Sequence, residues 1–386
     1  MAKKAIFPEH SAAIEALLAR ALRGEDAAWP RALTNTEMSE LWPPMSAHGI
    51  SGLLVQLPFA QLGWPQELCD YIREEARLQA LWEAEHQPLI AALIDAAHTA
   101  AIPAIIMKGT ALAYSLYADP AHRRRGDTDL LIRPGDLAAM RATLSKLGWE
   151  QRGQPRLSQE DWAPPSRSGV DHIVDLHWAV SNAPAIAEGL PFEDFFISKQ
   201  ELPQLSAHAY SPSAVHQLLQ ASVNQASHKL EGMGGGEADI LGGRRLIWAC
   251  DCHLISRDFE TAHWDELIEK ALVARLAGTM RQGLLLAQDT LGSQVPAFVM
   301  EALQRGARDD RAIAYFDAPS AAYRFAADVK ASKGLAAKAR VIKVHVMATP
   351  ELLHARYPER LDAPLWQLRM RRIASIAWQS LGQLVR

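Results

Sequence analysis

The sequence contains few cysteines, no long uninterrupted apolar run and no signal-peptide pattern. Three cysteines in 386 residues are too few for a disulfide framework, which indicates a reducing compartment. The most apolar stretch, residues 89–107, is interrupted by Asp95, His98 and Pro103, so it does not predict a membrane span. The first residues are followed closely by polar ones, unlike a signal peptide. We therefore expect a cytoplasmic protein with no membrane partner.

A strong excess of positive charge is also missing. The formal net charge is -4 and the sequence pI is about 6.4, so a broad electrostatic grip on nucleic acid is not expected. Long nucleic acid is therefore not predicted as a partner, although a local basic patch stays open. What is present is ordinary for a globular protein: 49% apolar and 22% charged residues. A chain of 386 residues predicts two or three domains.

Both ends of the chain carry helical patterns. Apolar residues recur at helical spacing from about residue 10 to residue 100, and a long amphipathic helix is expected over 78–99. Pro88 lies inside that helix, so a kink or a break is expected there. Helical patterns return from about residue 211, with a flexible connection of six glycines over residues 231–243.

The middle of the chain predicts a strand, a tight turn and a helix in succession. Residues 102–107 are apolar and partly β-branched, and a helix is expected over 111–117. Between them stand Lys108, Gly109 and Thr110. A glycine and a small hydroxyl residue at a helix start let backbone N–H groups approach an anion. The spacing of a Walker A loop is absent, so this turn alone is a weak phosphate signal, and Lys108 is equally consistent with a solvated lysine.

A short acidic motif opens the next predicted strand. Asp127 and Asp129 precede the apolar residues 130–132, and in an extended backbone both carboxylates point to the same side. Two like charges this close raise each other's pKa, and a bound divalent cation removes that cost. Hard cations prefer oxygen ligands, so the pair predicts an Mg²⁺ or Mn²⁺ site. The alternative is a polar turn that happens to carry two aspartates.

A third carboxylate lies on a later apolar segment. After a proline-rich, polar loop over 151–168, residues 170–180 predict one strand or a hairpin. Asp175 is flanked there by apolar residues, and a lone buried carboxylate is costly without a partner. His177 shares its face, either to orient it or touch substrate, or as an ordinary structural histidine. Three carboxylates meeting at a sheet edge can hold two divalent ions for phosphoryl transfer.

Two arginines and one further histidine complete the candidate set. Arg123 and Arg125 alternate along the chain just before the acidic motif, which would align them with the two aspartates and with phosphate oxygens. The alternative is a solvated basic run. His228 lies on a predicted helix and could line a substrate groove, although packing in the core is the simpler interpretation.

The order of these motifs resembles the uncharacterised nucleotidyltransferases of the polymerase-beta superfamily. The resemblance rests on residues 108–110, 117–120, 123–132 and 174–178, and it is strongest from about residue 78 to residue 180. It implies an α+β fold, with a small mixed β-sheet nucleotidyltransferase core flanked by N-terminal and C-terminal helical regions. We expect the limits to be 1–95 for the first helical region, 96–205 for the core and 206–386 for the C-terminal helical domain.

The same resemblance implies an activity and roles for the residues. Asp127, Asp129 and Asp175 would be the catalytic metal ligands, and Gly109 and Thr110 would form the phosphate turn, where the superfamily usually has Gly-Ser. The implied cofactor is Mg²⁺ (or Mn²⁺), and the implied co-substrate is a nucleoside triphosphate (NTP). A nucleoside monophosphate (NMP) would pass to a hydroxyl of a small molecule, peptide or protein, with release of pyrophosphate.

Two other interpretations stay open. A metal hydrolase built on His172, Asp175 and His177 would hold one transition metal. A non-catalytic, nucleotide-binding regulatory module would bind NTP and release no pyrophosphate.

Overall fold

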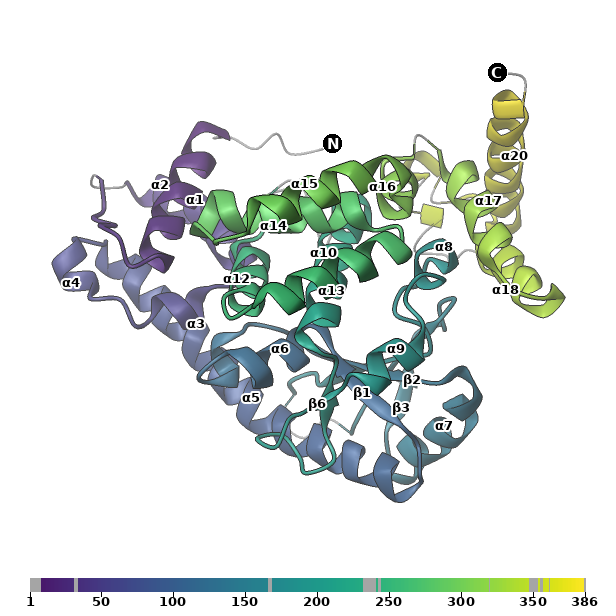
Figure 1. Cartoon of the computed structure of the whole chain (residues 1–386), viewed down its shortest axis with the longest axis horizontal. Coiled ribbons are helices and arrows are strands. Elements are labelled where there is room, and N and C mark those ends of the chain that lie inside the picture. The colour runs from purple at the N-terminus through teal and green to yellow at the C-terminus, as the bar shows by residue number, and fades with distance from the viewer. Residues whose placement is uncertain are drawn as a thin grey trace.

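Figure 1 shows helices packed around a central sheet. The structure is a computed structural model, and it describes residues 8–30, 34–165, 169–231, 241, 244–318, 320–346, 353–354, 357–360 and 362–384. Most of the glycine-rich connection predicted over 231–243 lies outside the described residues.

Five strands form the central sheet in the order β1-β2-β5-β4-β3. The β2–β5 pair is parallel and the other neighbours are antiparallel, so the sheet is mixed. The strands are β1 (Ala104–Met107), β2 (Asp127–Ile132), β3 (Glu150–Arg152), β4 (Gln159–Ala163) and β5 (Ile173–His177). A separate hairpin joins β6 (Gln200–Glu201) and β7 (Tyr210–Ser211). The predicted α+β class is confirmed.

The interpretation of residues 151–168 as a loop is wrong, because β4 and the end of β3 lie there. Their sequences are mostly polar, and β3 is exposed along its whole length. Such segments lack the apolar alternation that predicts a strand. They become strands because β4 pairs with the edge of β5, and β3 then pairs with β4. Pairing partners of this kind are invisible to a local pattern.

The N-terminal part is helical, as predicted. It contains α1 (Pro8–Leu22), α2 (Asn35–His48), α3 (Ser51–Leu54), α4 (Phe59–Leu62) and α5 (Gln66–Thr99). The 34-residue helix α5 continues through Pro88, so it is not broken there, and a kink at this position stays a prediction. Buried residues precede and follow the proline, and packing on both sides holds the helix together where one backbone hydrogen bond is lost.

The remaining helices lie between the strands or after them in the chain. Two lie between strands, α6 (Lys108–Leu116) and α7 (Leu137–Lys146), and two short ones follow β5, α8 (Pro184–Ala187) and α9 (Phe192–Ile197). The predicted C-terminal helices are present as α10 (Ala214–Glu231), α12 (Leu246–Ser256), α13 (Thr261–Val273), α14 (Ala277–Leu291), α15 (Ala297–Gly306), α16 (Arg311–Phe316), α17 (Ala321–Ala331), α18 (Leu335–Val346) and α20 (Leu365–Leu384).

Helices cover both faces of the sheet. Ile90 and Leu93 of α5 pack with Leu130 of β2 on one face. On the other face, Leu131 of β2 packs in a cluster with Val223 of α10. Because strand side chains alternate, Asp127 and Asp129 lie on the same face as Leu131, toward α10.

The largest apolar cluster joins the N-terminal helices to helices that follow the sheet, because it runs from Leu17 of α1 to Leu303 of α15. The expected limit between residues 95 and 96 falls inside α5, and the three-part division of the chain stays a prediction. Within the described residues, every helix is too short or too polar to cross a lipid bilayer.

Candidate active site

A cavity of about 1120 Å³ opens between the sheet and the helices α5, α10 and α12. Of the ten predicted site residues, only Thr110 does not line it. Those that do are Lys108, Gly109, Arg123, Arg125, Asp127, Asp129, Asp175, His177 and His228. Segments more than 100 residues apart in the sequence therefore contribute to one wall, although the roles of these residues stay predictions.

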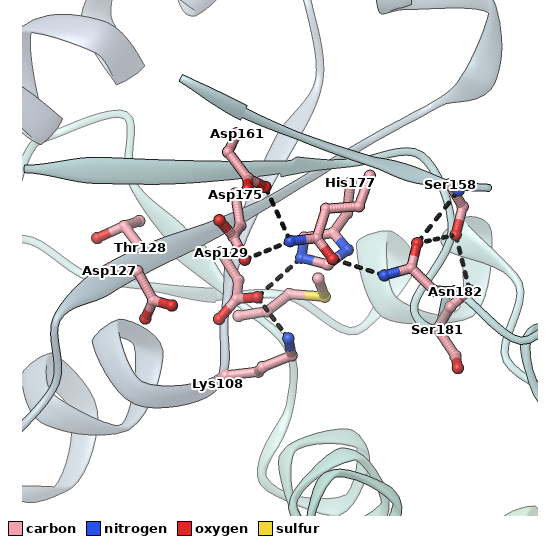
Figure 2. A network of polar contacts seen from close by, with 12 residues as sticks. Lys108, Asp127, Thr128, Asp129, Ser158, Asp161, Asp175, His177, Ser181 and Asn182 are labelled. Atoms are coloured by element: carbon pink, nitrogen blue, oxygen red, sulfur yellow. Dashed lines mark hydrogen bonds and ion pairs between the residues drawn. The ribbon is translucent and has the colours of Figure 1, made fainter. Parts of the chain in front are cut away.

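Strand register brings the carboxylates together. Asp129 of β2 faces Asp175 of the parallel strand β5, and Asp161 of β4 faces Asp175 from the other side. Asp127 lies two residues before Asp129 on the same strand face. Figure 2 shows the four carboxylates together, with Lys108 and His177 beside Asp129. We call Asp127, Asp129, Asp161 and Asp175 the aspartate row.

Asp129 is the most firmly held member of the row. It is 4% exposed, and its Oδ1 accepts hydrogen bonds from Lys108 Nζ at 2.5 Å and from His177 Nε2 at 2.8 Å. Burial alone would raise the pKa of Asp129, but the charge of Lys108 and the hydrogen bond from His177 outweigh burial and hold the pKa well below its usual range. Asp129 is therefore a carboxylate at any pH near neutral.

Asp127 and Asp175 are carboxyl groups whose negative charge the surrounding protein disfavours. Loss of water around the carboxylate, and then the charges of Asp129 and Asp127, raise the pKa of Asp175 to about 8. The same two causes, loss of water and the charge of Asp129, raise the pKa of Asp127 to about 6. Among the residues that the structure describes, neither forms an ion pair with a basic side chain. The row therefore has more negative charge than its neighbours balance.

His177 contacts Asp129, the neighbour of Asp175 in the sheet, and not Asp175 itself. Burial, and then the charge of Lys108, lower the pKa of His177, against the effect of its hydrogen bond with Asp129. The ring is therefore neutral near pH 7, with Nε2–H donating to Asp129 and a buried Nδ1 that finds no hydrogen-bond partner among the described residues. Ligand atoms of Asp129, Asp175 and His177 all lie within 4.8 Å of one another, which fits one divalent cation.

Thr110 lies behind the cavity wall. It is 1% exposed, and its hydroxyl contacts the Thr128 hydroxyl at 2.8 Å and the backbone carbonyl of Asp127 at 3.2 Å. Arg125 Nε donates to the same hydroxyl at 3.1 Å. The hydroxyl of Thr110 therefore does not face the cavity, and the predicted part of Thr110 in a phosphate turn, which rests on its backbone N–H, stays a prediction. The hydroxyl fastens the first turn of α6 to the start of β2, which leaves backbone groups and Lys108 to face the cavity.

Gly109 packs closely against two arginines, so a side chain there would push them aside by a few tenths of an ångström. A Cβ atom there would lie 3.2 Å from Nη1 of Arg123 and 3.4 Å from Cβ of Arg125. Lys108 itself has a positive φ of 49°, which turns the chain from β1 directly into α6. This sharp turn places the N-terminus of α6 beside the aspartate row, and the backbone N–H of Lys108, the first residue of the helix, donates to Oε1 of Gln220 at 3.2 Å.

The two predicted arginines are each held by an acid, in a group that we call the arginine network. Arg123 donates to both carboxylate oxygens of Asp251 of α12, at 3.1 and 2.6 Å. Arg125 forms an ion pair with Glu83 of α5, and this pair is buried. The members are Arg123, Arg125, Glu83 and Asp251. This network ties the turn before β2 to helices on either side of the sheet.

The alternative hydrolase set is not brought together. Asp175 and His177 share the cavity face of the sheet. His172 comes just before β5, and the alternation of side chains along the strand places it on the other face. Its Nδ1 faces Nδ1 of His86 at 3.3 Å, and its Nε2 lies 3.3 Å from Glu85. His172 therefore belongs to the packing between α5 and the sheet.

Sequence reasoning missed the contribution of β4 and of the segment after β5. Asp161, Gln159 and Asn182 all line the cavity. No local pattern marks them, because Asp161 and Gln159 lie in a polar segment that resembles a loop. Only the register with β5, which places Asp161 opposite Asp175, identifies the fourth aspartate.

Comparison with known proteins gives one match. A family model described as uncharacterised nucleotidyltransferase matches residues 34–292, which include the sheet, α5, α10 and α12 and therefore most of the cavity. No curated protein and no solved structure matches the chain. The match covers well over half of the sequence and contains all of the predicted site residues. The chain belongs to this family of uncharacterised nucleotidyltransferases.

Proposed function

We propose that this protein is a metal-dependent nucleotidyltransferase that moves an NMP from an NTP to a hydroxyl group. The acceptor would be a small molecule, a peptide or a protein, and pyrophosphate would be released. The observation that carries the proposal is the aspartate row, in which Asp127 and Asp175 remain without a basic partner among the described residues. Asp129 is buried, Asp175 is half-buried and Asp127 is exposed, and carboxylates this close together repel one another unless a cation joins them.

The donor set fits Mg²⁺ or Mn²⁺. Asp127, Asp129 and Asp175 would hold the ions through oxygen atoms, which hard cations prefer. His177 supports Asp129 through Nε2 and is a possible further ligand or orienting group. Bound ions would neutralise the triphosphate and activate the acceptor hydroxyl.

The residues beside the row would receive the triphosphate. Lys108 is partly exposed to the cavity and is the nearest ammonium group to Asp129. Gly109 and the first turn of α6 present backbone N–H groups, and the N-terminus of a helix favours negative charge. Arg123 and Arg125 also line the cavity, but their ion pairs with Asp251 and Glu83 balance their charges and hold them in place, so they would shape the wall beside the triphosphate and not act as mobile ligands.

The opposite wall would receive the nucleoside or the acceptor. His228 of α10 and Trp248 of α12 both line the cavity, and their rings stack with centroids 5.3 Å apart. Stacked rings at the edge of a polar cavity suit a flat base. In the transfer step, the acceptor oxygen would bond to the α-phosphorus and give up its proton to water or to a carboxylate of the row. The bond from that phosphorus to the bridging oxygen would break, and pyrophosphate would leave with the electron pair.

The test is a labelling experiment. The protein is incubated with each α-labelled NTP, Mg²⁺ and a cell extract, and mass analysis identifies what becomes labelled. We expect transfer of a labelled NMP with wild-type protein and its loss in Asp129→Asn. Labelling that survives in Asp129→Asn would refute the proposed site, and NTP binding without any transfer would favour the regulatory alternative.

A further inference from the structure

A chain of side-chain amides supports the carboxylate of Asp175 from the β4 side of the sheet. Gln159, the first residue of β4, is 2% exposed. Its Nε2 donates hydrogen bonds to Oδ2 of Asp175 and, at 3.2 Å, to Oδ1 of Asp161. Its Oε1 accepts a hydrogen bond from Nδ2 of Asn182 at 2.6 Å. The NH₂ group of Gln159 thus donates to two carboxylates, and its oxygen accepts from the amide of Asn182.

A backbone group fixes the direction of this chain. The oxygen of Asn182 accepts from the backbone N–H of Ser158 at 3.2 Å, as Figure 2 shows. A backbone N–H can only donate, so the oxygen of Asn182 faces Ser158 and its nitrogen faces Gln159. Gln159 must then meet Asn182 with its own oxygen. Its NH₂ group is therefore left facing the two carboxylates, and the reverse orientation would break the chain at two points.

We propose that Gln159, oriented by Asn182, is the positioning residue that holds Asp175 for cation binding. By engaging Oδ2, it fixes the rotation of the carboxylate and hence the direction of the other oxygen. An amide oxygen in the same place would repel the carboxylate and leave it free to turn. This inference rests on the proposed function, because it treats Asp175 as a ligand of the divalent cation.

The test reverses the amide chain without removing it. In Asn182→Asp, the new carboxylate still accepts from the backbone of Ser158 but has no hydrogen for Gln159. The Gln159 amide must then turn over and present its oxygen to Asp175. We expect the Kd for Mn²⁺, measured by electron paramagnetic resonance without nucleotide, to rise roughly 10–100-fold, the usual cost of losing a group that supports a metal ligand.

The direction in which the Kd for Mn²⁺ changes distinguishes this inference from simple electrostatics. An added carboxylate near a cation site attracts the cation, so electrostatics alone predicts unchanged or tighter Mn²⁺ binding in Asn182→Asp. That result would overturn the inference. The matched control is Ser158→Ala, which removes the hydroxyl but keeps the backbone N–H that sets the orientation. Weakening of Mn²⁺ binding to the same extent in the control would also overturn it, because general disruption of the loop would then be the cause.

Two further measurements complete the design. Thermal unfolding without metal shows whether each variant folds, and Gln159→Met, which keeps the side-chain length and removes both donors, replaces Asn182→Asp should that variant not fold. The same weakening of Mn²⁺ binding is expected, and normal binding would contradict the inference. Absence of Mn²⁺ binding by the wild type would contradict the proposed function as well. Mn²⁺ binding that is equal in wild type and variant would contradict this inference alone.

Discussion

Two groups of charged residues meet at the cavity and differ in their balance. In the arginine network each buried acid has an arginine, so its charges cancel inside the protein. In the aspartate row two ion pairs, from Lys108 and from Arg156, face four carboxylates. A balanced network stabilises or orients the fold, whereas an unbalanced row stores a repulsion that a ligand can relieve. The difference indicates which group is structural and which binds.

Removing a charge from the aspartate row should reduce function most and should not reduce stability. In Asp175→Asn, the asparagine oxygen can still accept from Gln159, but the acid is gone that must hold a proton in the folded state below about pH 8 and is an unbalanced charge above it. We expect NMP transfer to fall on the order of a thousandfold or more, the scale seen when transition-state charge loses its stabilisation. The melting temperature without metal should rise. A fall in melting temperature with transfer intact would invert the comparison and contradict it.

Removing an acid from the arginine network should have the opposite result. Glu83→Ala leaves Arg125 buried without its partner, and breaking a buried pair costs about 3–5 kcal/mol. Chemical denaturation measures the change in the free energy of unfolding. Mn²⁺ binding by the folded fraction should persist, because Glu83 does not line the cavity. Normal stability in this variant would show that the network is not what holds the turn before β2.

Lys108 combines the features of the two groups, because it balances an acid and also faces the cavity where a ligand would bind. It neutralises Asp129 in the free protein and is placed to meet a triphosphate. In Lys108→Met, we expect the KM for NTP to rise roughly ten- to a hundredfold, as for loss of a charge-assisted hydrogen bond. Lys146→Met on the exposed end of α7 is the matched control and should leave the KM unchanged. A change in kcat alone would place Lys108 outside the triphosphate site.

The pH dependence of stability gives the smallest and most specific effect. The pKa of Asp175 is about 8 in the folded protein, far above the value for an unfolded aspartate, so the folded state holds a proton that the unfolded chain has lost. Stability without metal should therefore fall as the pH rises toward 8, with Asp127 contributing in the same sense up to about pH 6. Thermal unfolding across pH 6 to 8 tests this, and Asp175→Asn should flatten the curve.

Mg²⁺ should reverse this trend. Because cations bind the deprotonated carboxylates, the rise in melting temperature on adding Mg²⁺ should grow between pH 6 and pH 8. A stabilisation by Mg²⁺ that does not depend on pH in this window would place the cation away from Asp127 and Asp175.

The sequence predicts the aspartates better than the groups that support them. Asp127, Asp129 and Asp175 are visible because each is a carboxylate in or beside an apolar segment, which is costly without a partner. Gln159 and Asp161 are ordinary residues in a polar segment, and only the pairing of β4 with β5 places them beside the candidate site. Asn182 follows β5 and meets Gln159 through the fold.

The direction of the Thr110 side chain and the unbroken helix at Pro88 have the same physical origin. The hydroxyl of Thr110 suits a phosphate by its type, but its direction depends on the neighbouring strand, where Thr128 and Arg125 take it. Pro88 weakens a helix locally, and burial of α5 against the sheet decides that the helix continues. Residue chemistry can be read from the sequence, whereas the direction of a side chain and the fate of a helix depend on contacts far along the chain.

The central claim is that the aspartate row is the binding site of the divalent cation. The most direct measurement is a crystal structure with Mn²⁺ and a non-hydrolysable NTP, in which anomalous scattering locates the metal. The predicted result is an anomalous peak in contact with carboxylate oxygens of Asp129 and Asp175, with the triphosphate toward Lys108. A bound triphosphate whose metal lies elsewhere, with Asp175 still held by Gln159 and remote from the metal, would contradict the claim.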